Sequence, residues 1–577
     1  MSNETAVEKT GRYQGIARFL PILSWLPNYD RSWLIGDLIA GLSVWALMVP
    51  TSLGYAEISG VPVQHGLYAA AFGLIAFALF TTSHHVTQGP GSSTAAVLGA
   101  AVALLASRGT DQAVAVAGAV VIVAGLLYVV MSLLKLGWIS QFLSQSVLTG
   151  FVFGVAINVA VGQLDKITGT DTSGENAWRE LWAWISALPE ISLPTLVLGI
   201  AALVLLFGQK LFAPKIPGAL VAVVLGILAT ALFGLEDLGI ALIAEVPRGL
   251  PSFSLPDLNL ILDNLATIVG AAVGLLLIGF SVTTAGVRSY ANKHNYRIDI
   301  DQELLAQGTS NLASGLFQGI FVNGSLSKSP VADDAGAKSQ LYNIFQAAFI
   351  ILTLLFLAPL FSLLPQAVLG AIIIQAVVTG MMDVAEMTRI NTIKRSEFLI
   401  ALLALLGVIT FGILWGVVIG VFLSLAWLVA VSARPTIPEL GRKPGTSAFF
   451  DLQLHPEADT YPGVSILRYD GGLTFINTEA FGDRLRQIRL GADPAIEGLI
   501  LTMEGVNYID VQGSDTLNEV AKACKLHDID IRLVRIKPQV LEVLEKEGVY
   551  DLIGPERIHS NIAEAVDAYL ENKGRQP

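Results

Sequence analysis

Long apolar runs dominate the chain from Gly36 to Ser432, and many approach the roughly 20 residues that a helix needs to cross a bilayer. In hydrocarbon the backbone must satisfy its own hydrogen bonds, so such runs fold as helices. The composition agrees, because 53% of residues are hydrophobic and 14% are charged, against roughly 25% charged in soluble domains. These features predict a polytopic α-helical membrane protein and exclude an ordinary soluble enzyme or a disordered chain.

Fourteen apolar stretches can be placed along this region. They cover residues 36–57, 66–82, 92–106, 112–134, 140–163, 193–212, 216–235, 259–291, 302–319, 329–338, 341–361, 364–382, 395–412 and 413–433. Two of them, 92–106 and 329–338, are too short to span a bilayer alone. The first 30 residues are polar and lack the short apolar core and cleavage site of a signal peptide.

Basic residues in the short loops predict the orientation in the membrane. One set of connections is basic and holds Lys135, Lys210, Lys215, Arg288, Lys293, Arg297, Arg389, Lys394, Arg395 and Arg434. The opposite set is acidic and holds Asp165, Asp171, Glu175, Glu180, Glu190, Glu236, Asp237, Glu245 and Asp257. We therefore expect a multi-pass protein of the cell (inner or plasma) membrane with both termini in the cytoplasm.

The composition changes near Pro435, where charged residues return to the density of a soluble domain. Strand-like runs alternate with helical stretches beyond this point, which predicts a small α/β domain. The strands are expected at 464–469, 473–476, 498–502 and 531–536, and the helices near 477–490, 512–527, 538–547 and 560–572. The expected domains are a cytoplasmic segment over 1–30, a transport domain over 31–434, and a cytoplasmic domain with its linker over 435–577.

Several functional classes are disfavoured by what the sequence lacks. The net charge of -12 leaves no basic stripe for nucleic acid. The tail holds no Gly-rich phosphate loop, no metal-spaced His or Cys cluster, and no Ser, His and Asp set at recognisable spacing. The single cysteine, Cys524, makes an internal disulfide impossible. We expect neither catalysis nor a cofactor.

A short polar segment, Thr87–Thr94, breaks the apolar region in its first half. An extended segment is expected to end at Pro90 and its neighbouring glycines, and the three hydroxyl residues that follow can begin a helix. These are Ser92, Ser93 and Thr94. An unpaired backbone N–H in hydrocarbon costs several kcal/mol, so such a break predicts a function.

A second break, Asn323–Pro330, lies in the other half of the chain. Ser327 or Ser329 can serve as the N-cap of a helix, and Pro330 suits its first position. Lys328 adds a full positive charge beside this helix start. Both breaks therefore predict helix N-termini within the membrane.

Two helix N-termini in corresponding positions of two halves are typical of inverted-repeat transporters, which hold substrate between broken helices. Each N-terminus offers free N–H groups and roughly half a positive charge, so it binds anions. A lone lysine in the membrane costs at least about 2.5 to 3.5 kcal/mol, which a bound anion would offset. The alternative is that Lys328 reaches to the membrane interface and Pro330 merely starts a helix.

The other polar candidates each have more than one interpretation. Tyr55 faces the same cavity from a kinked first helix, or it is an interfacial aromatic anchor. Gln88 donates to an oxyanion, or it satisfies the broken backbone nearby. Asp333 and Asp334 pair with Lys328, bind a coupling cation such as Na⁺ or H⁺, or sit in cytoplasmic water at the end of a short helix.

Characteristic motifs follow one another along nearly the whole chain. They are Gly36-Asp-Leu-Ile-Ala-Gly41, Val49-Pro-Thr-Ser-Leu-Gly-Tyr-Ala56, Gly60-Val-Pro, Gly66-Leu-Tyr68, Tyr296-Arg-Ile-Asp-Ile-Asp-Gln-Glu-Leu304, Gly324-Ser-Leu-Ser-Lys-Ser329 and Ala335-Gly-Ala337. In the tail, Tyr508-Ile-Asp-Val-Gln-Gly513 precedes a helical stretch. Together they resemble the sulfate permease (SulP) family of anion transporters, with a C-terminal STAS domain.

The resemblance implies a uracil permease-like fold of fourteen segments in two inverted repeats of seven, divided into core and gate subdomains. Segments three and ten would supply the facing half-helices. Members carry sulfate, bicarbonate, chloride or dicarboxylates, usually by an elevator motion and commonly as homodimers in the lipid bilayer. The STAS-like tail is expected to act in assembly or regulation, with a cytosolic partner.

The sequence differs from the family pattern in three places. Lys328 stands where members typically carry arginine, so planar bidentate geometry is lost while the charge is kept. Val282 stands where many carry glutamate two residues beyond Phe280, so a proton-coupling role does not transfer to it. Gln512 stands where bacterial anti-sigma antagonists are phosphorylated, which rules out that modification there, while Ser514 nearby remains available.

The leading hypothesis is a secondary active transporter of small anions. Its predicted substrate-binding residues are Tyr55, Gln88, Ser92, Ser93, Thr94, Ser327, Lys328 and Ser329, and its candidate coupling-ion residues are Asp333 and Asp334. An uncoupled anion channel or a voltage-responsive prestin-like protein is the alternative suggested by Val282. A nucleobase permease on the same fold, or a receptor that binds without translocation, are further alternatives.

Overall fold

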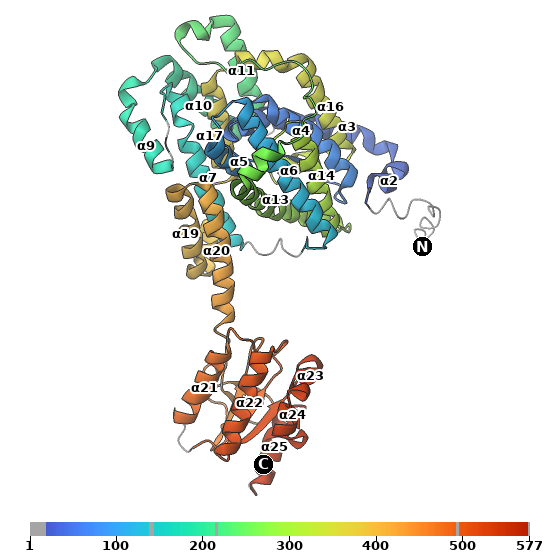
Figure 1. The fold of residues 1–577 in the computed structure, drawn as a ribbon, viewed down its shortest axis with the longest axis vertical. Coiled ribbons are helices and arrows are strands. Elements are labelled where there is room, and N and C mark those ends of the chain that lie inside the picture. The colour runs from blue at the N-terminus through green and yellow to red at the C-terminus, as the bar shows by residue number, and fades with distance from the viewer. Residues whose placement is uncertain are drawn as a thin grey trace. The chain divides into compact units, whose positions relative to one another are not determined.

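The computed structural model describes residues 19–137, 144–172, 174, 176–213, 217–491 and 495–574. The chain divides into two compact units, Met1–Ser424 and Leu425–Pro577, and each is described by itself (Figure 1). Parts of the regions named above lie outside the described residues: most of the segment 1–30, the ends of two apolar stretches at 140–143 and 216, and the loop residues Glu175 and Lys215.

Each of the fourteen apolar stretches contains a helix. They are α3 (Leu34–Ile58), α4 (Gln64–Phe80), α5 (Ser92–Leu105), α6 (Asp111–Leu133), α7 (Gln145–Val161), α10 (Leu193–Phe212), α11 (Gly218–Phe233), α13 (Leu265–His294), α14 (Ile300–Leu316), α15 (Ser329–Asp334), α16 (Leu341–Leu352), α17 (Gln366–Gly380), α19 (Arg395–Phe411) and α20 (Ile413–Ser432). Shorter helices connect them, among them α2 (Ile22–Trp25), α8 (Leu164–Thr168), α9 (Ala177–Ser186), α12 (Leu258–Asp263) and α18 (Val384–Ile393). The predicted polytopic helical architecture is confirmed.

Six helical segments among the described residues are long and apolar enough to cross a membrane. They are Arg31–Ile58, Asp111–Leu133, Gln145–Thr168, Leu265–His294, Leu341–Leu363 and Gln366–Ile393. Shorter apolar helices accompany them, including α4, α5, α10 and α11. α5 and α15 are short because each begins at one of the two polar breaks, after residues that do not continue a helix.

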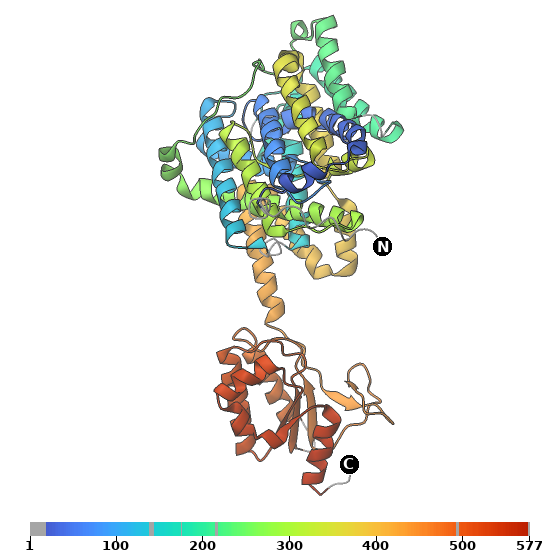
Figure 2. The ribbon, with the colours of Figure 1, turned by 90° about the vertical axis from the view of Figure 1, so that its right-hand side faces the viewer.

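The helices of the first unit pack in two groups (Figures 1 and 2). In the first group, α14 lies against α4 and α6, α16 lies against α3 and α4, and α13 lies against α5 and α6. In the second group, α7 packs on α19, and α17 packs on α7, α10 and α11. The groups meet where α3 contacts α17 and α11, and where α5 contacts α7.

Glycines permit the closest helix contacts, as is usual between helices in membranes. A Cβ on Gly150 of α7 would collide with the carbonyl oxygen of Ala401 in α19. Where the two groups meet, a Cβ on Gly54 of α3 would lie 2.9 Å from Cγ1 of Ile373 in α17. Tight backbone approach therefore occurs both within the second group and between the groups.

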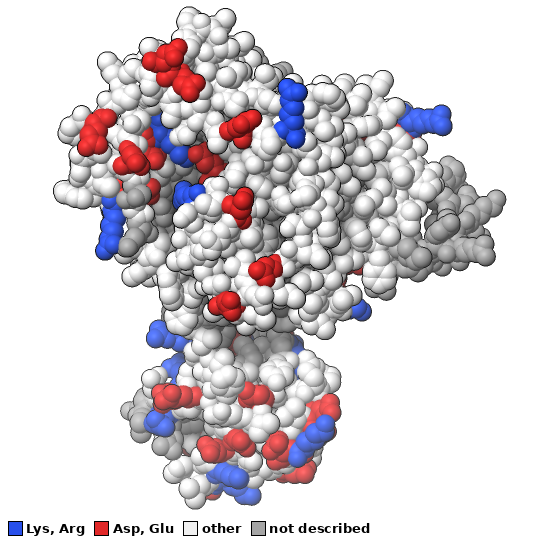
Figure 3. Space-filling model, turned by 45° about the horizontal axis from the view of Figure 1, so that its top comes forward, with Lys and Arg blue, Asp and Glu red and all other residues white. Residues whose placement is uncertain are grey.

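The outer surface of the first unit is largely apolar. Figure 3 shows one face on which wide areas carry neither basic nor acidic side chains. Large apolar residues of α10, α11 and α20 are exposed, such as Leu211, Phe233 and Phe422. A soluble protein rarely exposes so much contiguous apolar surface, whereas a bilayer would cover it.

The second unit has a parallel sheet at its centre. Its strands are β5 (Val464–Arg468), β6 (Gly498–Thr502), β7 (Asp530–Val534) and β8 (Ile558–His559), in that spatial order. The helices are α21 (Thr478–Gly491), α22 (Val511–Leu526), α23 (Pro538–Lys546), α24 (Val549–Ile553) and α25 (Ile562–Asn572). An antiparallel pair, β3 (Leu440–Arg442) and β4 (Phe449–Asp451), completes it.

Alternating side chains of the strands bury both faces of this sheet, with helices on each side (Figure 2). Leu467 and Leu501 pack with residues of α21 to α24, while Ile466 and Ile500 pack with α25. Two covered faces are typical of parallel sheets. The predicted α/β fold of the tail is confirmed.

The predicted strand at 473–476 is wrong. Leu473 forms only an isolated bridge with Ile509. The next N–H groups bond to side chains instead of a neighbouring strand: Thr474 donates to Asn477 Oδ1 at 2.9 Å, and Phe475 donates to Asp510 Oδ2 at 2.9 Å. Because side chains accept these hydrogen bonds, the apolar run is a loop between β5 and α21.

Candidate functional site

The two polar breaks pair with each other. β1 (Gln88–Pro90) precedes α5, β2 (Val322–Gly324) precedes α15, and the two short strands run antiparallel and buried. Their register is Gln88↔Gly324, Gly89↔Asn323 and Pro90↔Val322. Mutual pairing satisfies backbone that would otherwise be exposed to hydrocarbon. It also brings the starts of two half-helices, one from each half of the chain, into one place.

The two glycines at the first break lie close to neighbouring side chains. A Cβ on Gly89 would lie 2.5 Å from Cε of Met48, and one on Gly91 would lie 2.5 Å from Oδ1 of Asn323. Thr94 in the first turn of α5 donates through its hydroxyl to the same Asn323 oxygen at 3.1 Å. Asn323 therefore connects the second break to the helix that starts at the first.

Lys328 is buried at the start of α15, with 4% of its side chain exposed. Its ammonium lies over the ring of Tyr55, 5.4 Å from the ring centroid. Within the described parts of the chain, no carboxylate forms an ion pair with it. Tyr55 is buried on α3, and its hydroxyl lies near Ser92 in the first turn of α5. The structure thus brings together a lysine, an aromatic ring and both half-helix starts.

The predicted serine N-cap of α15 is wrong. Lys328 itself occupies the N-cap position and no side chain caps the helix. Ser327 is exposed, while Ser329 is buried and donates to the Ser325 carbonyl at 2.7 Å. The reason is a turn that starts earlier, in which Ser325 Oγ accepts from the Lys328 N–H at 3.2 Å.

The serines at the start of α5 are placed differently. Gly91 is the N-cap residue and no side chain caps the helix, so Ser92 opens α5 as predicted. Ser92 and Ser93 are partly exposed and Thr94 is buried. An uncapped first turn leaves backbone N–H groups available to an anion.

Gln88 is fully buried, where its amide donates to Gln307 Oε1 at 2.9 Å and weakly to the Val322 carbonyl at 3.4 Å. Its own carbonyl oxygen has no hydrogen-bond partner. These contacts match the interpretation in which Gln88 satisfies the broken backbone. They aim its amide at protein acceptors rather than at a ligand.

A polar stripe on α14, not among the predicted site residues, holds the second break. Asn311 Oδ1 accepts from the Val322 N–H and its amide donates to the Val322 carbonyl, both at 2.9 Å. Ser314 donates to the Ile320 carbonyl at 2.6 Å. Gln307, Asn311 and Ser314 recur at helical spacing inside an apolar stretch, and that periodicity was the available signal.

Two buried carboxylates in the family motifs, Asp37 and Glu303, accept hydrogen bonds from loop residues. Asp37 Oδ1 accepts from the backbone N–H groups of Lys338, at 2.7 Å, and Ser339, at 3.2 Å. Glu303 accepts from the hydroxyl of Thr81 and from the backbone N–H of Thr82, at 2.7 Å. Their role in the structure is therefore to bind chain segments.

Asp333 does not pair with Lys328. One of its oxygens lies 2.6 Å from Lys293 Nζ, and the other lies 3.0 Å from His294 Nε2. Asp334 is exposed at the end of α15. Of the interpretations offered by the sequence, the ion pair with Lys328 is not formed.

A cavity of about 810 Å³ lies where the two groups of helices meet. Glu57 of α3 forms an ion pair there with Lys166 of α8, and Lys166 also donates to Gln163 at 3.0 Å. Glu180 of α9, outside the membrane-spanning segments, lines the same cavity. Burial raises the pKa of Glu180 to about 7, while the nearby Arg108 opposes the shift.

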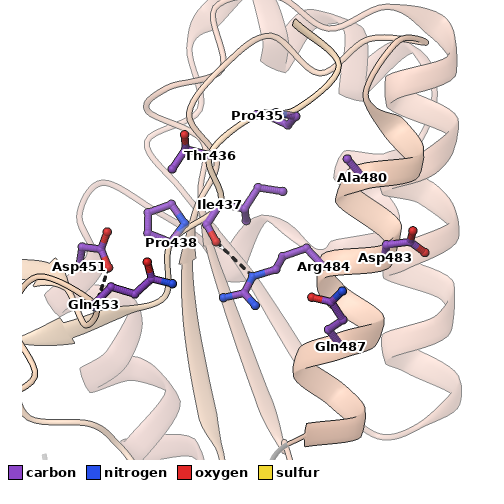
Figure 4. A pocket seen from close by; sticks show the side chains of 10 residues that line it. All are labelled: Pro435, Thr436, Ile437, Pro438, Asp451, Gln453, Ala480, Asp483, Arg484 and Gln487. Carbon is purple, nitrogen blue, oxygen red and sulfur yellow. Dashed lines mark hydrogen bonds between the residues drawn. The ribbon is translucent and has the colours of Figure 1, made fainter. Parts of the chain in front are cut away.

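The second unit has a smaller cavity of about 400 Å³ between the β3–β4 region and α21 (Figure 4). Arg484 crosses it and donates to the carbonyl of Ile437 at 3.2 Å. None of its lining residues was predicted to act in transport.

Ser514, expected to remain available for phosphorylation, is fully buried in α22. That expectation is wrong, because the helix turns this hydroxyl into the core rather than toward solvent.

Comparisons with known proteins identify both units. The sulfate permease family matches residues 34–404, and the STAS domain matches residues 455–565. A probable sulfate transporter of Mycobacterium tuberculosis is 30% identical over 552 residues, covering 94% of this chain and 98% of the relative. A chloroplastic sulfate transporter of Arabidopsis thaliana is 29% identical, covering 96% and 83%.

Solved structures share the fold. The murine Solute Carrier 26 family member A9 anion transporter, in an inward-facing state, matches with a TM-score of 0.88 at 22% identity, over 99% of this chain and 97% of that one. The transmembrane domain of a cyanobacterial bicarbonate transporter matches with a TM-score of 0.59 at 23% identity, over 69% and 98%.

Proposed function

The chain belongs to the sulfate permease family, and we propose that it is a secondary active transporter of a small anion. The named relatives make sulfate the first substrate to test, followed by bicarbonate, chloride and dicarboxylates. The anion would lie between the half-helix starts of α5 and α15. Na⁺ or H⁺ is the expected coupling ion.

The buried Lys328 is the observation that carries this proposal. A charge in the membrane without a counter-ion is costly, and a bound anion would supply the missing negative charge. The uncapped first turn of α5 adds backbone N–H donors nearby. An oxyanion between them would meet both a full positive charge and fixed dipoles.

The two groups of helices suggest how the anion moves. Every predicted substrate-binding residue belongs to the first group, or to the breaks that it holds, and none belongs to the second. We therefore assign the first group as the core and the second as the gate of an elevator mechanism. Lys166 lies on α8, which packs on α10 and α17 of the second group, so the Glu57–Lys166 ion pair then connects core to gate.

The remaining assignments follow the sequence analysis. The transport domain spans 31–434, the STAS domain with its linker spans 435–577, and both termini face the cytoplasm. The protein acts as a homodimer in the cell membrane. The STAS domain serves assembly or regulation with a cytosolic partner.

Uptake into proteoliposomes tests the proposal. The purified protein is assayed with labelled sulfate, bicarbonate, chloride and a dicarboxylate, with and without Na⁺ and pH gradients. We expect Lys328→Ala to lower uptake at subsaturating anion by about tenfold or more, since charge-assisted contacts contribute roughly 1.5–3 kcal/mol. Unchanged uptake would show that the site is misassigned.

A matched control uses Lys338, an exposed lysine ten residues further along the chain. Lys338→Ala removes the same charge but leaves the backbone N–H that Asp37 accepts. It should transport like the parent protein. Currents without countertransport in the same vesicles would instead favour an uncoupled channel.

A further inference from the structure

A cluster of imidazole and carboxylate groups lies beside α15, apart from the predicted anion site. His85 comes from the loop after α4, His294 from the last turn of α13, and Asp333 from α15. Their ligand atoms all lie within 4.8 Å of one another. Among the described residues this is the one such group of three or more His, Cys, Asp or Glu side chains.

Three ring nitrogens in this cluster are buried without a hydrogen bond. They are both nitrogens of His85 and Nε2 of His294. His85 is 5% exposed. Buried polar groups normally find partners, and an unpaired one costs free energy. His294 Nε2 nevertheless contacts Asp333 Oδ1 at 3.0 Å, so the two nitrogens of His85 are the ones left without a polar partner among the described residues.

The two imidazoles stack face to face, with centroids 3.9 Å apart and planes 5° from parallel. Stacking of this kind packs the rings but leaves their nitrogen lone pairs unused. Tyr290 and Tyr296 lie against His85 in the same stack. Aromatic packing therefore accounts for the positions of the rings and not for their unpaired nitrogens.

We infer that His85, His294 and Asp333 form a binding site for a divalent transition metal ion, with Zn²⁺ as the test ion. Neutral imidazoles and one carboxylate suit Zn²⁺, Cu²⁺ or Ni²⁺ and not Mg²⁺. Three protein ligands leave a fourth position of a tetrahedral ion open to water.

Binding requires the ligands to move closer together. Ligand atoms around tetrahedral Zn²⁺ lie roughly 3.3 Å apart, given bonds of about 2.0–2.2 Å. Because imidazole lone pairs lie in the ring plane, the two rings must rotate out of their parallel stack, about their Cβ–Cγ bonds, for both to face one ion. Lys293, whose side chain is 59% exposed, is free to swing from Asp333 into solvent as the metal replaces its charge.

The ion would join three separate segments, the loop before β1, the end of α13 and the half-helix α15. Because Lys328 stands at the start of α15, an occupied site would hold this helix in place. Metal binding itself does not depend on whether the chain transports anions.

The experiment uses the full-length protein in detergent, purified with a tag that contains no histidine. Zn²⁺ binding is measured by calorimetry, with Mg²⁺ as the hard-cation control. We expect one Zn²⁺ per chain and a rise in the melting temperature with Zn²⁺ but not with Mg²⁺. Absence of stoichiometric Zn²⁺ binding would overturn the inference.

Single substitutions identify the ligands. His85→Ala, His294→Ala and Asp333→Asn should each weaken Zn²⁺ binding by about tenfold or more. His84→Ala is the matched control, because His84 is the adjacent histidine and is exposed. Equal losses in His84→Ala and His85→Ala would overturn the assignment.

A measurement on the parent protein avoids variants that fail to fold. Electron paramagnetic resonance of protein loaded with one Cu²⁺ should show splitting from two imidazole nitrogens. A spectrum without nitrogen splitting would contradict a site built from His85 and His294.

Discussion

The ammonium of Lys328 lies 5.4 Å from the centroid of the Tyr55 ring, so α15 and α3 meet at the candidate anion site. The ring face is electron-rich and stabilises the ammonium while no anion is bound. An arriving anion would meet a lysine that is already held in place. In this arrangement the Tyr55 ring acts on Lys328, whereas its hydroxyl lies near Ser92.

Replacing the ring should weaken transport more than removing the hydroxyl. We expect Tyr55→Leu to raise the anion concentration for half-maximal uptake several-fold, because a cation–π contact contributes about 0.5–2 kcal/mol. Tyr55→Phe keeps the ring and should change the anion concentration for half-maximal uptake less. Proteoliposome uptake measures both, and an equal loss in the two variants would assign the effect to the hydroxyl and its contact with Ser92.

The Glu57–Lys166 pair should couple the two groups of helices. Glu57→Gln or Lys166→Gln breaks it, and the exchanged variant Glu57→Lys with Lys166→Glu should recover part of the loss. We expect a coupling free energy of about 1 kcal/mol in a double-mutant cycle of thermal stability, since the pair is partly buried. The pair of Arg389 and Glu386, within one helix and with 58% of the arginine side chain exposed, provides the control and should contribute about 0.5 kcal/mol or less.

The raised pKa of Glu180 predicts a pH-dependent stability. The folded protein disfavours the ionised carboxylate, so stability is lost as pH rises from the ordinary value of 4.5 to about 7. Glu180→Gln should therefore be more stable than the parent at pH 8, by about 1–2 kcal/mol after allowance for solvent screening. The difference should shrink as pH falls toward 5, and melting curves over this range measure it. A difference that is constant with pH would contradict the assignment.

Asp37 should be a structural residue. Asp37→Ala leaves the buried N–H groups of Lys338 and Ser339 without their acceptor, which we expect to lower stability by about 2 kcal/mol or more. Asp334→Ala, at an exposed position, should change stability by about 0.5 kcal/mol or less. Thermal unfolding in detergent checks both. Equal effects would mean that the contacts of Asp37 contribute little.

Removal of the second unit should leave the anion site intact. A chain ending after Arg434 retains every predicted substrate-binding residue, so its anion dissociation constant should stay within about twofold of the parent value. Its transport rate, dimer stability or trafficking should change. Loss of anion binding in a folded, truncated protein would contradict the proposed role of the STAS domain.

The sequence predicted the membrane helices well because hydrophobicity and length are local properties. Each of the fourteen apolar stretches holds a helix, and α5 starts at Ser92 as expected. The pairing of Gln88 with Gly324 could not be predicted from local sequence patterns, because it joins residues far apart in the chain. The N-cap of α15 was missed since Ser325, four residues before the helix, receives the hydrogen bond that organises the turn.

Clusters of side chains from several helices could not be predicted from the sequence either. His85, His294 and Asp333 are scattered through the sequence with no metal-ligand spacing, and only the folded chain brings them together. The prediction of a strand at 473–476 was wrong although a local signal was present. Its apolar pattern was correct, but the side chains of Asn477 and Asp510 took its backbone hydrogen bonds.

The contact between Thr94 and Asn323 spans 229 residues of chain, which has a consequence for synthesis. When the first break leaves the ribosome, the strand that will pair with it has not yet been made. Backbone at Gln88–Pro90 must therefore keep water or other partners until Val322–Gly324 arrives. The candidate anion site is consequently a late product of membrane insertion, and a nascent chain that stops before the second break lacks half of its residues.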